Sequence, residues 1–171
     1  MKDSYVTFRK SELITSNNQF LEITISVLSK GCLFRFQASG SSMSPFIKNG
    51  DVITLAPPSQ KTIHRGTVAA FLSPLAGKLV VHRIVDHKGG KFLLKGDTCR
   101  QPDGWVDPLD IIGVVVGVER GDKPVRFGGG QVRGVLACLS KYSVLQFSIG
   151  LSYAIYRRLF RGVTHEQRQQ N

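Results

Sequence analysis

A hydroxyl-rich turn holds the first residues of this chain that could do chemistry. From Gly40 to Asp51 it reads Gly-Ser-Ser-Met-Ser-Pro-Phe-Ile-Lys-Asn-Gly-Asp, and it leads into the apolar run 52–55. Serine is a weak nucleophile at its free pKa, so a reactive serine needs a base within hydrogen-bond distance and a rigid turn that presents it. Most serine-rich turns are structural. A catalytic interpretation of Ser42 therefore depends on a base elsewhere in the sequence.

The segment 78–85, Lys-Leu-Val-Val-His-Arg-Ile-Val, places a histidine in a predicted strand. Strand alternation puts His82 on the same face as Val80 and Ile84, and Arg83 on the opposite face. An imidazole among aliphatic side chains is either a hydrogen-bonded core histidine or a general base, and the pattern alone favours the core histidine. A free imidazole has a pKa near ~6.5, so a histidine can accept a serine proton at neutral pH.

Two aspartates follow at a fixed spacing. The run 92–97 reads Phe-Leu-Leu-Lys-Gly-Asp, and Asp103 comes six residues after Asp97. A histidine base needs a carboxylate on its other ring nitrogen, which fixes the tautomer and stabilises the imidazolium. Because aspartate beside glycine is common in loops, turn formation is the alternative role for both residues.

Together, the Ser-Met-x-Pro turn, the Val-His-Arg strand and the Lys-Gly-Asp run resemble the three boxes of the signal peptidase I family. The histidine matches the archaeal and endoplasmic-reticulum branch, whereas bacterial members and the related SOS-repressor peptidases use a lysine. The resemblance implies that Ser42 is the nucleophile, His82 the base, Asp103 the residue that orients His82, and Asp97 a supporting residue. It also implies a mainly β fold: a coiled β-sheet catalytic core with N- and C-terminal helices.

The resemblance assigns the residues around the nucleophile to an oxyanion and substrate turn, which comprises Gly40, Ser41, Met43 and Pro45. The chain departs from the family at two places. Many members carry a serine at the position of Gly40, whose hydroxyl helps to hold the oxyanion, and asparagines at the positions of Thr98 and Cys99. The backbone N–H of Ser42 can still donate to an oxyanion, and the second donor stays open.

Periodicity predicts the order of elements. Residues 11–30 are expected to be helical, with an alternating strand pattern at 21–27 as the alternative. Predicted strands are 33–38, 51–56, 66–72, 78–87, 92–95 and 111–119, with 125–127 as an added edge. The glycines at 128–130 form a joint. We therefore expect an N-terminal helical segment (1–31), a β-rich core (32–127) and a basic, amphipathic C-terminal helical segment (128–171).

The composition limits location and partners. The chain has 171 residues, a net charge of +11 and three cysteines without a C-x-x-C pair, which fits a reducing compartment. It has no secretory signal and no apolar run long enough to span a bilayer, so we expect a cytoplasmic protein, or one that is peripheral on the membrane. Residues 120–171 carry nine basic and two acidic side chains. This basic segment is expected to contact an anionic membrane, with a solvated face or core packing as alternatives; no nucleic-acid partner is expected.

The sequence thus predicts a serine endopeptidase that cleaves an extended peptide, or a leader or signal sequence, bound as an added strand. No cofactor is expected. No metal site is expected either, because His82 and His87 lie five residues apart on a strand and point to opposite faces. One alternative is a non-catalytic peptide-binding or membrane-surface module on the same fold. The other is a self-cleaving regulator, which is disfavoured because it would need an Ala-Gly or Cys-Gly bond before the nucleophile, whereas residues 31–32 read Gly-Cys.

Overall fold

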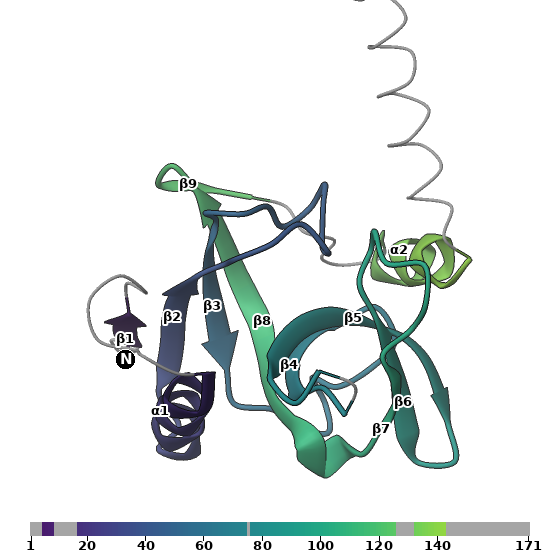
Figure 1. The fold of residues 1–171 in the computed structure, drawn as a ribbon, viewed down its shortest axis with the longest axis horizontal. Coiled ribbons are helices and arrows are strands. Elements are labelled where there is room, and N and C mark those ends of the chain that lie inside the picture. Colours follow the sequence, from purple (N-terminus) through teal and green to yellow (C-terminus); the bar gives the residue numbers. More distant parts are fainter. Residues whose placement is uncertain (1–4, 9–16, 75, 126–131, 143–171) are drawn as a thin grey trace, which may run out of the picture.

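The computed structural model describes residues 5–8, 17–74, 76–125 and 132–142 (Figure 1). The helices of these residues are α1 (Asn17–Ser29), α2 (Val132–Lys141) and the short 3-10 helix η1 (Pro108–Asp110). The strands are β1 (Tyr5–Phe8), β2 (Leu33–Gln37), β3 (Val52–Ala56), β4 (Val68–Leu72), β5 (Leu79–Lys88), β6 (Lys91–Lys95), β7 (Gly104–Val106), β8 (Ile111–Arg120) and β9 (Lys123–Pro124). The fold is mainly β, which confirms the fold class predicted from the sequence.

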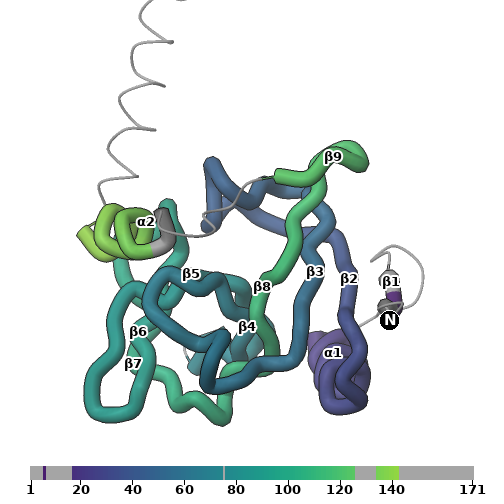
Figure 2. Tube along the Cα trace, turned by 180° about the vertical axis from the view of Figure 1, so that it is seen from behind, coloured from purple at the N-terminus to yellow at the C-terminus, as the bar shows by residue number. Residues whose placement is uncertain are grey.

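Strand β8 joins the two halves of the sheet. The strands lie in the order β1-β2-β3-β8-β4-β5-β6-β7, and β9 pairs with the end of β8. One part of β8 (114–119) pairs with β3 and another (111–114) pairs with β4, and each pairing contains a register shift. Such irregularities increase the local twist. In Figures 1 and 2, β1 to β3 accordingly lie on one side of β8, while β4 to β7 coil on the other.

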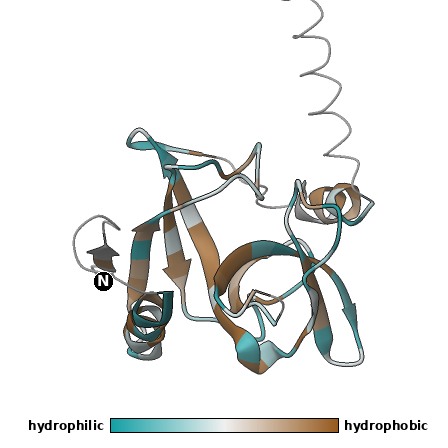
Figure 3. Cartoon of the chain, in the orientation of Figure 1, coloured by the Kyte–Doolittle hydropathy of each residue, from teal (hydrophilic) through white to brown (hydrophobic). Residues whose placement is uncertain are grey.

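The coiled sheet encloses two apolar clusters, whose strands are coloured brown in Figure 3. Strand β4 contributes to both clusters, because its alternate residues face opposite sides and both sides are covered. The first cluster comprises Leu28, Phe34, Phe36, Met43, Ile47, Ile53, Leu55, Val68, Ala70, Val115 and Val118. The second comprises Ala69, Phe71, Ile84, Phe92, Leu94, Val106 and Ile111. Met43 and Ile47 belong to the serine-rich turn, so this turn is part of the core packing.

Six of the predicted strands are present, with ends that agree to within two residues. Strand β7 was missed, because a three-residue strand that starts with glycine has no detectable alternation. Residues 5–8 form a strand paired in parallel with β2, so the prediction that this part of the N-terminal segment is helical is wrong. Of the predicted edge at 125–127, the Val125 N–H donates to the Val118 carbonyl of β8 at 2.8 Å, directly after β9 (Lys123–Pro124), and residues 126–127 lie outside the described residues. The glycine joint at 128–130 lies outside the described residues.

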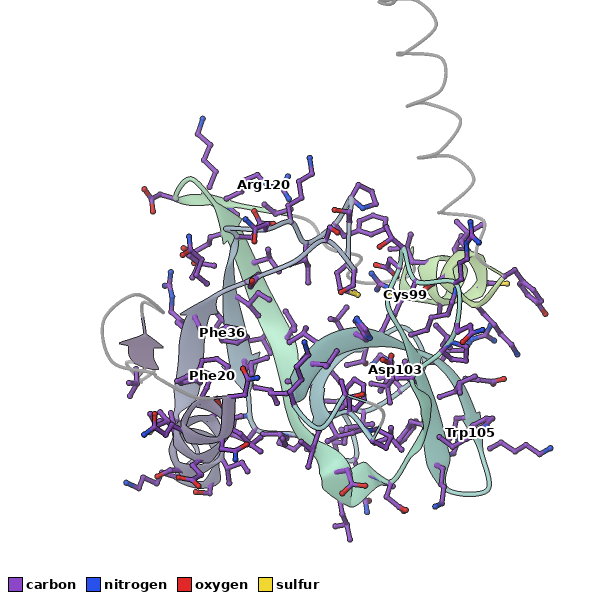
Figure 4. All side chains as sticks on the ribbon, viewed as in Figure 1. Phe20, Phe36, Cys99, Asp103, Trp105 and Arg120 are labelled. Carbon is purple, nitrogen blue, oxygen red and sulfur yellow. The ribbon has the colours of Figure 1, made fainter. Side chains whose placement is uncertain are left out.

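Helix α1 covers one side of the first cluster. Phe20 packs against Phe34 and Phe36, with ring centroids 5.7 and 5.2 Å away, and Figure 4 shows Phe20 and Phe36 close together. The buried Thr24 hydroxyl donates to the Phe20 carbonyl at 2.7 Å, which satisfies a polar group inside an apolar contact. Gly31 ends the helical region with φ +76°, a conformation that favours glycine. The helical prediction for 17–29 is therefore confirmed, and the strand alternative is wrong.

Helix α2 packs against β5. Lys141 pairs with Asp86 at 2.6 Å, and the buried ammonium of Lys95 donates to the carbonyl oxygen of Ser140. Burial lowers the pKa of Lys95. Of the predicted C-terminal helical segment, the structure describes only the part up to residue 142. Among the described residues, no helix is long and apolar enough to cross a membrane.

A buried carboxylate ties the serine-rich turn to the sheet. Asp51 is 2% exposed and accepts hydrogen bonds at 2.8 Å from Arg120 Nε, from Arg120 Nη2 and from the backbone N–H of Lys48. Arg120 lies at the end of β8 (Figure 4). The hydrogen bond from Arg120 is the main cause that lowers the pKa of Asp51. A carboxyl group with a lowered folded pKa stabilises the fold above its unfolded pKa, and this stabilisation is lost as the pH falls through the folded value.

We predict that Asp51→Asn lowers the free energy of unfolding at pH 7 by about 1–3 kcal/mol, because it replaces charge-assisted hydrogen bonds to a buried group. The difference from wild type should shrink as the pH falls below ~3.9, the ordinary aspartate pKa, since protonation then weakens the wild-type pair too. Urea unfolding of both proteins across this pH range measures it.

The matched control is Asp122→Asn, which makes the same chemical change at an exposed carboxylate of the β8–β9 turn. It should change the unfolding free energy little at any pH. A constant difference between Asp51→Asn and wild type from pH 7 to acid would contradict the assigned role of the Arg120–Asp51 pair.

Candidate active site

The turn between β2 and β3 presents Ser42. At its ends, the Ala38 N–H donates to the Asp51 carbonyl at 2.7 Å and the Gly50 N–H donates to the Ala38 carbonyl at 2.9 Å, which closes the loop. Met43, which directly follows Ser42, is buried. Because the loop is closed at its base and anchored in the core, Ser42 has the rigid support that a nucleophile needs.

His82 lies in the middle of β5, opposite Ala69 of β4. Its Nε2 is 2.9 Å from Ser42 Oγ. The ring is 5% exposed and lies 6.3 Å from the ring of Phe71, centroid to centroid. The strand therefore directs a largely desolvated imidazole at the serine hydroxyl, as expected from the face that His82 shares with Val80.

Asp103 contacts the other side of the imidazole. Its Oδ2 lies 2.6 Å from His82 Nδ1, and its backbone N–H donates to the Leu94 carbonyl at 2.9 Å. A carboxylate at Nδ1 favours the tautomer in which Nδ1 carries the proton and Nε2 is free to accept one. The structure thus brings Ser42, His82 and Asp103 into one hydrogen-bonded chain.

Asp97 has a different partner from Asp103. Arg83 donates to both of its oxygens, from Nε at 2.9 Å and from Nη2 at 2.8 Å, and both side chains are fully buried. Arg83 also donates to the Gly66 carbonyl at 3.1 Å and lies 5.5 Å from the centroid of the Phe46 ring. Removing one partner of such a buried pair typically costs about 3–5 kcal/mol, because the other charge is left uncompensated. Asp97 therefore fixes the 95–98 segment against β5 without touching His82.

The 95–98 segment approaches Ser42 so closely that a side chain at position 96 would clash with its surroundings. A Cβ on Gly96 would lie 2.9 Å from His82 Nε2, 2.9 Å from the Ser42 carbonyl oxygen and 2.6 Å from Cys99 Sγ. Burial raises the pKa of the Cys99 thiol. A thiol with a raised pKa stays protonated at neutral pH and is a poor nucleophile.

A cleft of about 1080 Å³ opens beside this group. One wall is the end of β2 with the turn that follows (36–43), and the other is the start of β5 (78–82); α1 adds Asn17 and Phe20. Thr98, Cys99 and Asp103 line the end of the cleft at the serine. The serine hydroxyl is therefore accessible from a groove between two strand segments.

The other turn residues singled out from the sequence have distinct surroundings. The Gly40 N–H donates to Asn49 Oδ1 at 3.1 Å, so Gly40 holds the turn together. The Ser41 side chain is exposed, and its carbonyl accepts the Ser44 N–H at 3.0 Å. Pro45 is exposed and follows a cis peptide bond.

The partner of Arg83 and the contacts of Thr98 were not predicted from the sequence. A signal for Arg83 existed: it alternates with His82 on a strand that is buried on both faces, and a buried arginine needs an acid. The contacts of Thr98 carry no local signal, because they depend on how the 95–98 segment packs against the serine-rich turn.

The other two histidines of the described residues lie apart from the site. His87 is exposed and stacks on Phe92 with centroids 4.7 Å apart, and exposed His64 hydrogen-bonds at its Nδ1 with Thr67. In the part of the chain that the structure describes, no group of three or more His, Cys, Asp or Glu side chains could hold a metal ion.

One family model, described as Peptidase S24-like, matches residues 5–116, from β1 through most of β8. The match begins well before residue 33, where the resemblance found in the sequence begins, and it is not specific to the histidine branch of signal peptidase I. No curated protein and no solved structure matches the chain. Since the match covers more than half of the sequence and all the residues that surround Ser42, the chain belongs to the Peptidase S24-like family.

Proposed function

We propose that this protein is a serine endopeptidase of the signal-peptidase type, which cleaves an extended peptide or a leader or signal sequence. The observation that carries the proposal is the hydrogen-bonded chain from Ser42 Oγ through His82 to Asp103, at 2.9 and 2.6 Å. Membership of the Peptidase S24-like family supports serine peptidase or self-cleaving activity in general. The kind of substrate rests on the resemblance of the three sequence boxes.

In the proposed reaction, Ser42 Oγ attacks the carbonyl carbon of the scissile bond while its proton passes to His82 Nε2. Asp103 accepts the Nδ1–H and stabilises the imidazolium that forms. When the tetrahedral intermediate collapses, the same proton moves from Nε2 to the leaving amine. Water then attacks the acyl-enzyme with His82 again acting as base, which releases the acid and restores the serine.

The intermediate carries an oxyanion that needs hydrogen-bond donors. The backbone N–H of Ser42 is the first proposed donor. Position 40 offers no hydroxyl, and its N–H already donates to Asn49, so Gly40 is a poor second donor. Losing one such donor typically costs ~10²–10³ in rate, which makes a low turnover number an expected property.

Two open strand edges support binding of an extended substrate. Leu79 to Val81 pair with β4 on one edge, and pairing with β6 begins only at Arg83, so within the described residues their other edge is open. On the facing wall, β1 pairs with β2 only up to Phe36. A peptide between the walls can hydrogen-bond to both edges, while its apolar side chains reach the cluster beneath the cleft.

A self-cleaving regulator is the competing function, because the family match supports it equally. The one Gly-Cys junction before the proposed nucleophile, Gly31–Cys32, does not support it: neither residue lines the cleft, and they directly precede strand β2, which is paired on both sides. Cleavage there in the same molecule would require β2 to leave the sheet.

We predict that Ser42→Ala lowers kcat/KM on a peptide library by roughly 10⁴–10⁶-fold, as for loss of a serine nucleophile elsewhere. Ser41→Ala is the matched control, because its side chain is exposed and only its backbone carbonyl is used in the turn. It should keep a measurable fraction of the activity. Cleavage of the protein's own chain, at a first-order rate that does not depend on protein concentration, would favour the self-cleaving function. An active Ser42→Ala enzyme would exclude Ser42 as the nucleophile.

A pH–rate profile tests the base. We expect kcat/KM to rise with pH through one ionisation, as His82 loses its proton, and then to level off, since a neutral imidazole is required. His82→Ala should remove this rise, and His82→Lys should not restore activity at neutral pH, because Asp103 would keep the new ammonium charged. His64→Ala and His87→Ala are the controls and should keep the wild-type profile. Survival of the acid limb in His82→Ala would make His82 a structural residue.

We also propose that the basic C-terminal segment contacts an anionic membrane surface. Val135 and Tyr142, exposed on and directly after α2, support this, as do Arg157, Arg158 and Arg161 in the sequence beyond the described residues. Co-sedimentation with vesicles should require anionic lipid and weaken with salt, with about 1 kcal/mol from each basic residue near the surface. Equal recovery with neutral and anionic vesicles would contradict it.

A further inference from the structure

Thr98 donates hydrogen bonds to two successive carbonyl groups, those of Ser41 and Ser42. Its hydroxyl donates to the Ser41 carbonyl at 3.0 Å, and its backbone N–H donates to the Ser42 carbonyl at 2.9 Å. The two hydrogen bonds come from one residue that lies more than fifty positions away in the sequence and lines the same cleft. Thr98 therefore helps to orient the peptide groups around Ser42, together with the Ser44 N–H, which also donates to the Ser41 carbonyl at 3.0 Å.

Peptide geometry converts this contact into a direction for the Ser42 N–H. In a trans peptide the C=O of one residue and the N–H of the next point in opposite directions within one plane. The Ser41–Ser42 bond is trans, since the only cis bond among the described residues precedes Pro45. Because the Ser41 carbonyl is held toward Thr98, the Ser42 N–H is held away from Thr98. Within the described residues this N–H donates to no protein acceptor.

The segment that carries Thr98 is itself fixed. Asp97 is bound by Arg83 at full burial, and Gly96 is packed against the Ser42 carbonyl with no room for a Cβ. The Cys99 N–H donates to the Gly96 carbonyl at 3.0 Å, which closes the turn. Thr98 therefore holds the Ser41–Ser42 peptide group at a fixed position relative to β5.

We infer that Thr98 is a positioning residue, which orients the Ser41–Ser42 peptide so that the Ser42 N–H donates to the oxyanion. The inference rests on the proposed function and deepens it. It assigns to Thr98 a role in the chemical step, carried out through the backbone of Ser42, and no direct contact with the reacting atoms. A hydroxyl at position 98 thereby compensates in part for the missing hydroxyl at position 40.

The experiment uses the full chain and an alkyl fluorophosphonate. In this reaction the Ser42 Oγ–P bond forms, the P–F bond breaks, fluoride leaves and the serine proton passes to His82, while the phosphoryl oxygen occupies the oxyanion position. Saturation kinetics separate the limiting rate (kinact) from the half-saturating concentration (KI). Wild type, Thr98→Val, Thr98→Ser and Thr62→Val are compared, and thermal unfolding is recorded for each.

We expect Thr98→Val to lower kinact by roughly 10- to 10²-fold, with KI nearly unchanged. This effect does not exceed the ~10²–10³-fold loss of rate that removal of a whole oxyanion donor causes. Thr98→Ser keeps the hydroxyl and should keep most of the wild-type kinact. Thr62→Val is the matched control, because Thr62 makes the same kind of hydroxyl-to-carbonyl bond (2.9 Å to Ser59) in a turn that does not line the cleft. It should leave both constants unchanged.

The inference is overturned if Thr98→Val keeps the wild-type kinact, if only KI changes, or if Thr98→Ser is as slow as Thr98→Val. Because serine would also restore any lost stability, kinact is measured at a temperature at which thermal unfolding shows every variant to be folded, so that a loss of rate does not reflect unfolding. A wild-type protein that does not react at Ser42 overturns the proposed function and this inference together, and the wild-type reaction alone reveals it.

Discussion

The alternation of side chains along β5 keeps the carboxylates of Asp97 and Asp103 apart. His82 and Arg83 are neighbours on β5, so their side chains leave opposite faces, and each meets its own aspartate: Asp103 on one face and Asp97 on the other. If both carboxylates lay on the face of His82, Arg83 would be buried without a partner, which costs several kcal/mol. The buried Arg83–Asp97 pair thus leaves Asp103 as the carboxylate that contacts the imidazole.

The Arg83–Asp97 pair also fixes the segment that packs against Ser42. By binding Asp97, Arg83 fixes the turn at residues 96–99. This turn places Gly96 against the Ser42 carbonyl and the Thr98 hydroxyl against the Ser41 carbonyl. A second buried carboxylate, Asp51, ties the other end of the serine-rich turn to β8. Ser42 is therefore held from two sides by ion pairs that take no part in the proposed chemistry, and the hydroxyl meets the imidazole without rearrangement of the backbone.

Much of this arrangement could be predicted from the sequence, because it depends on local patterns. The alternation in 78–85 placed His82 and Arg83 on opposite faces, and the spacing of Asp97 and Asp103 left two candidates for one histidine. The contact of Arg83 with Asp97 and the hydrogen bonds of Thr98 to the Ser41 and Ser42 carbonyls could not be predicted, since both depend on how distant segments pack. Strand β1 was missed because its pairing with β2 comes from tertiary contact and not from a pattern in four residues.

Mass-spectrometric mapping of the adduct left by an alkyl fluorophosphonate shows whether Ser42 is a nucleophile activated by His82. We expect one modified peptide, with the phosphonyl group on Ser42 in wild type, and no adduct in His82→Ala over the same time. Modification of Ser41 or of another serine, an unmodified wild-type protein, or equal labelling of His82→Ala would contradict it.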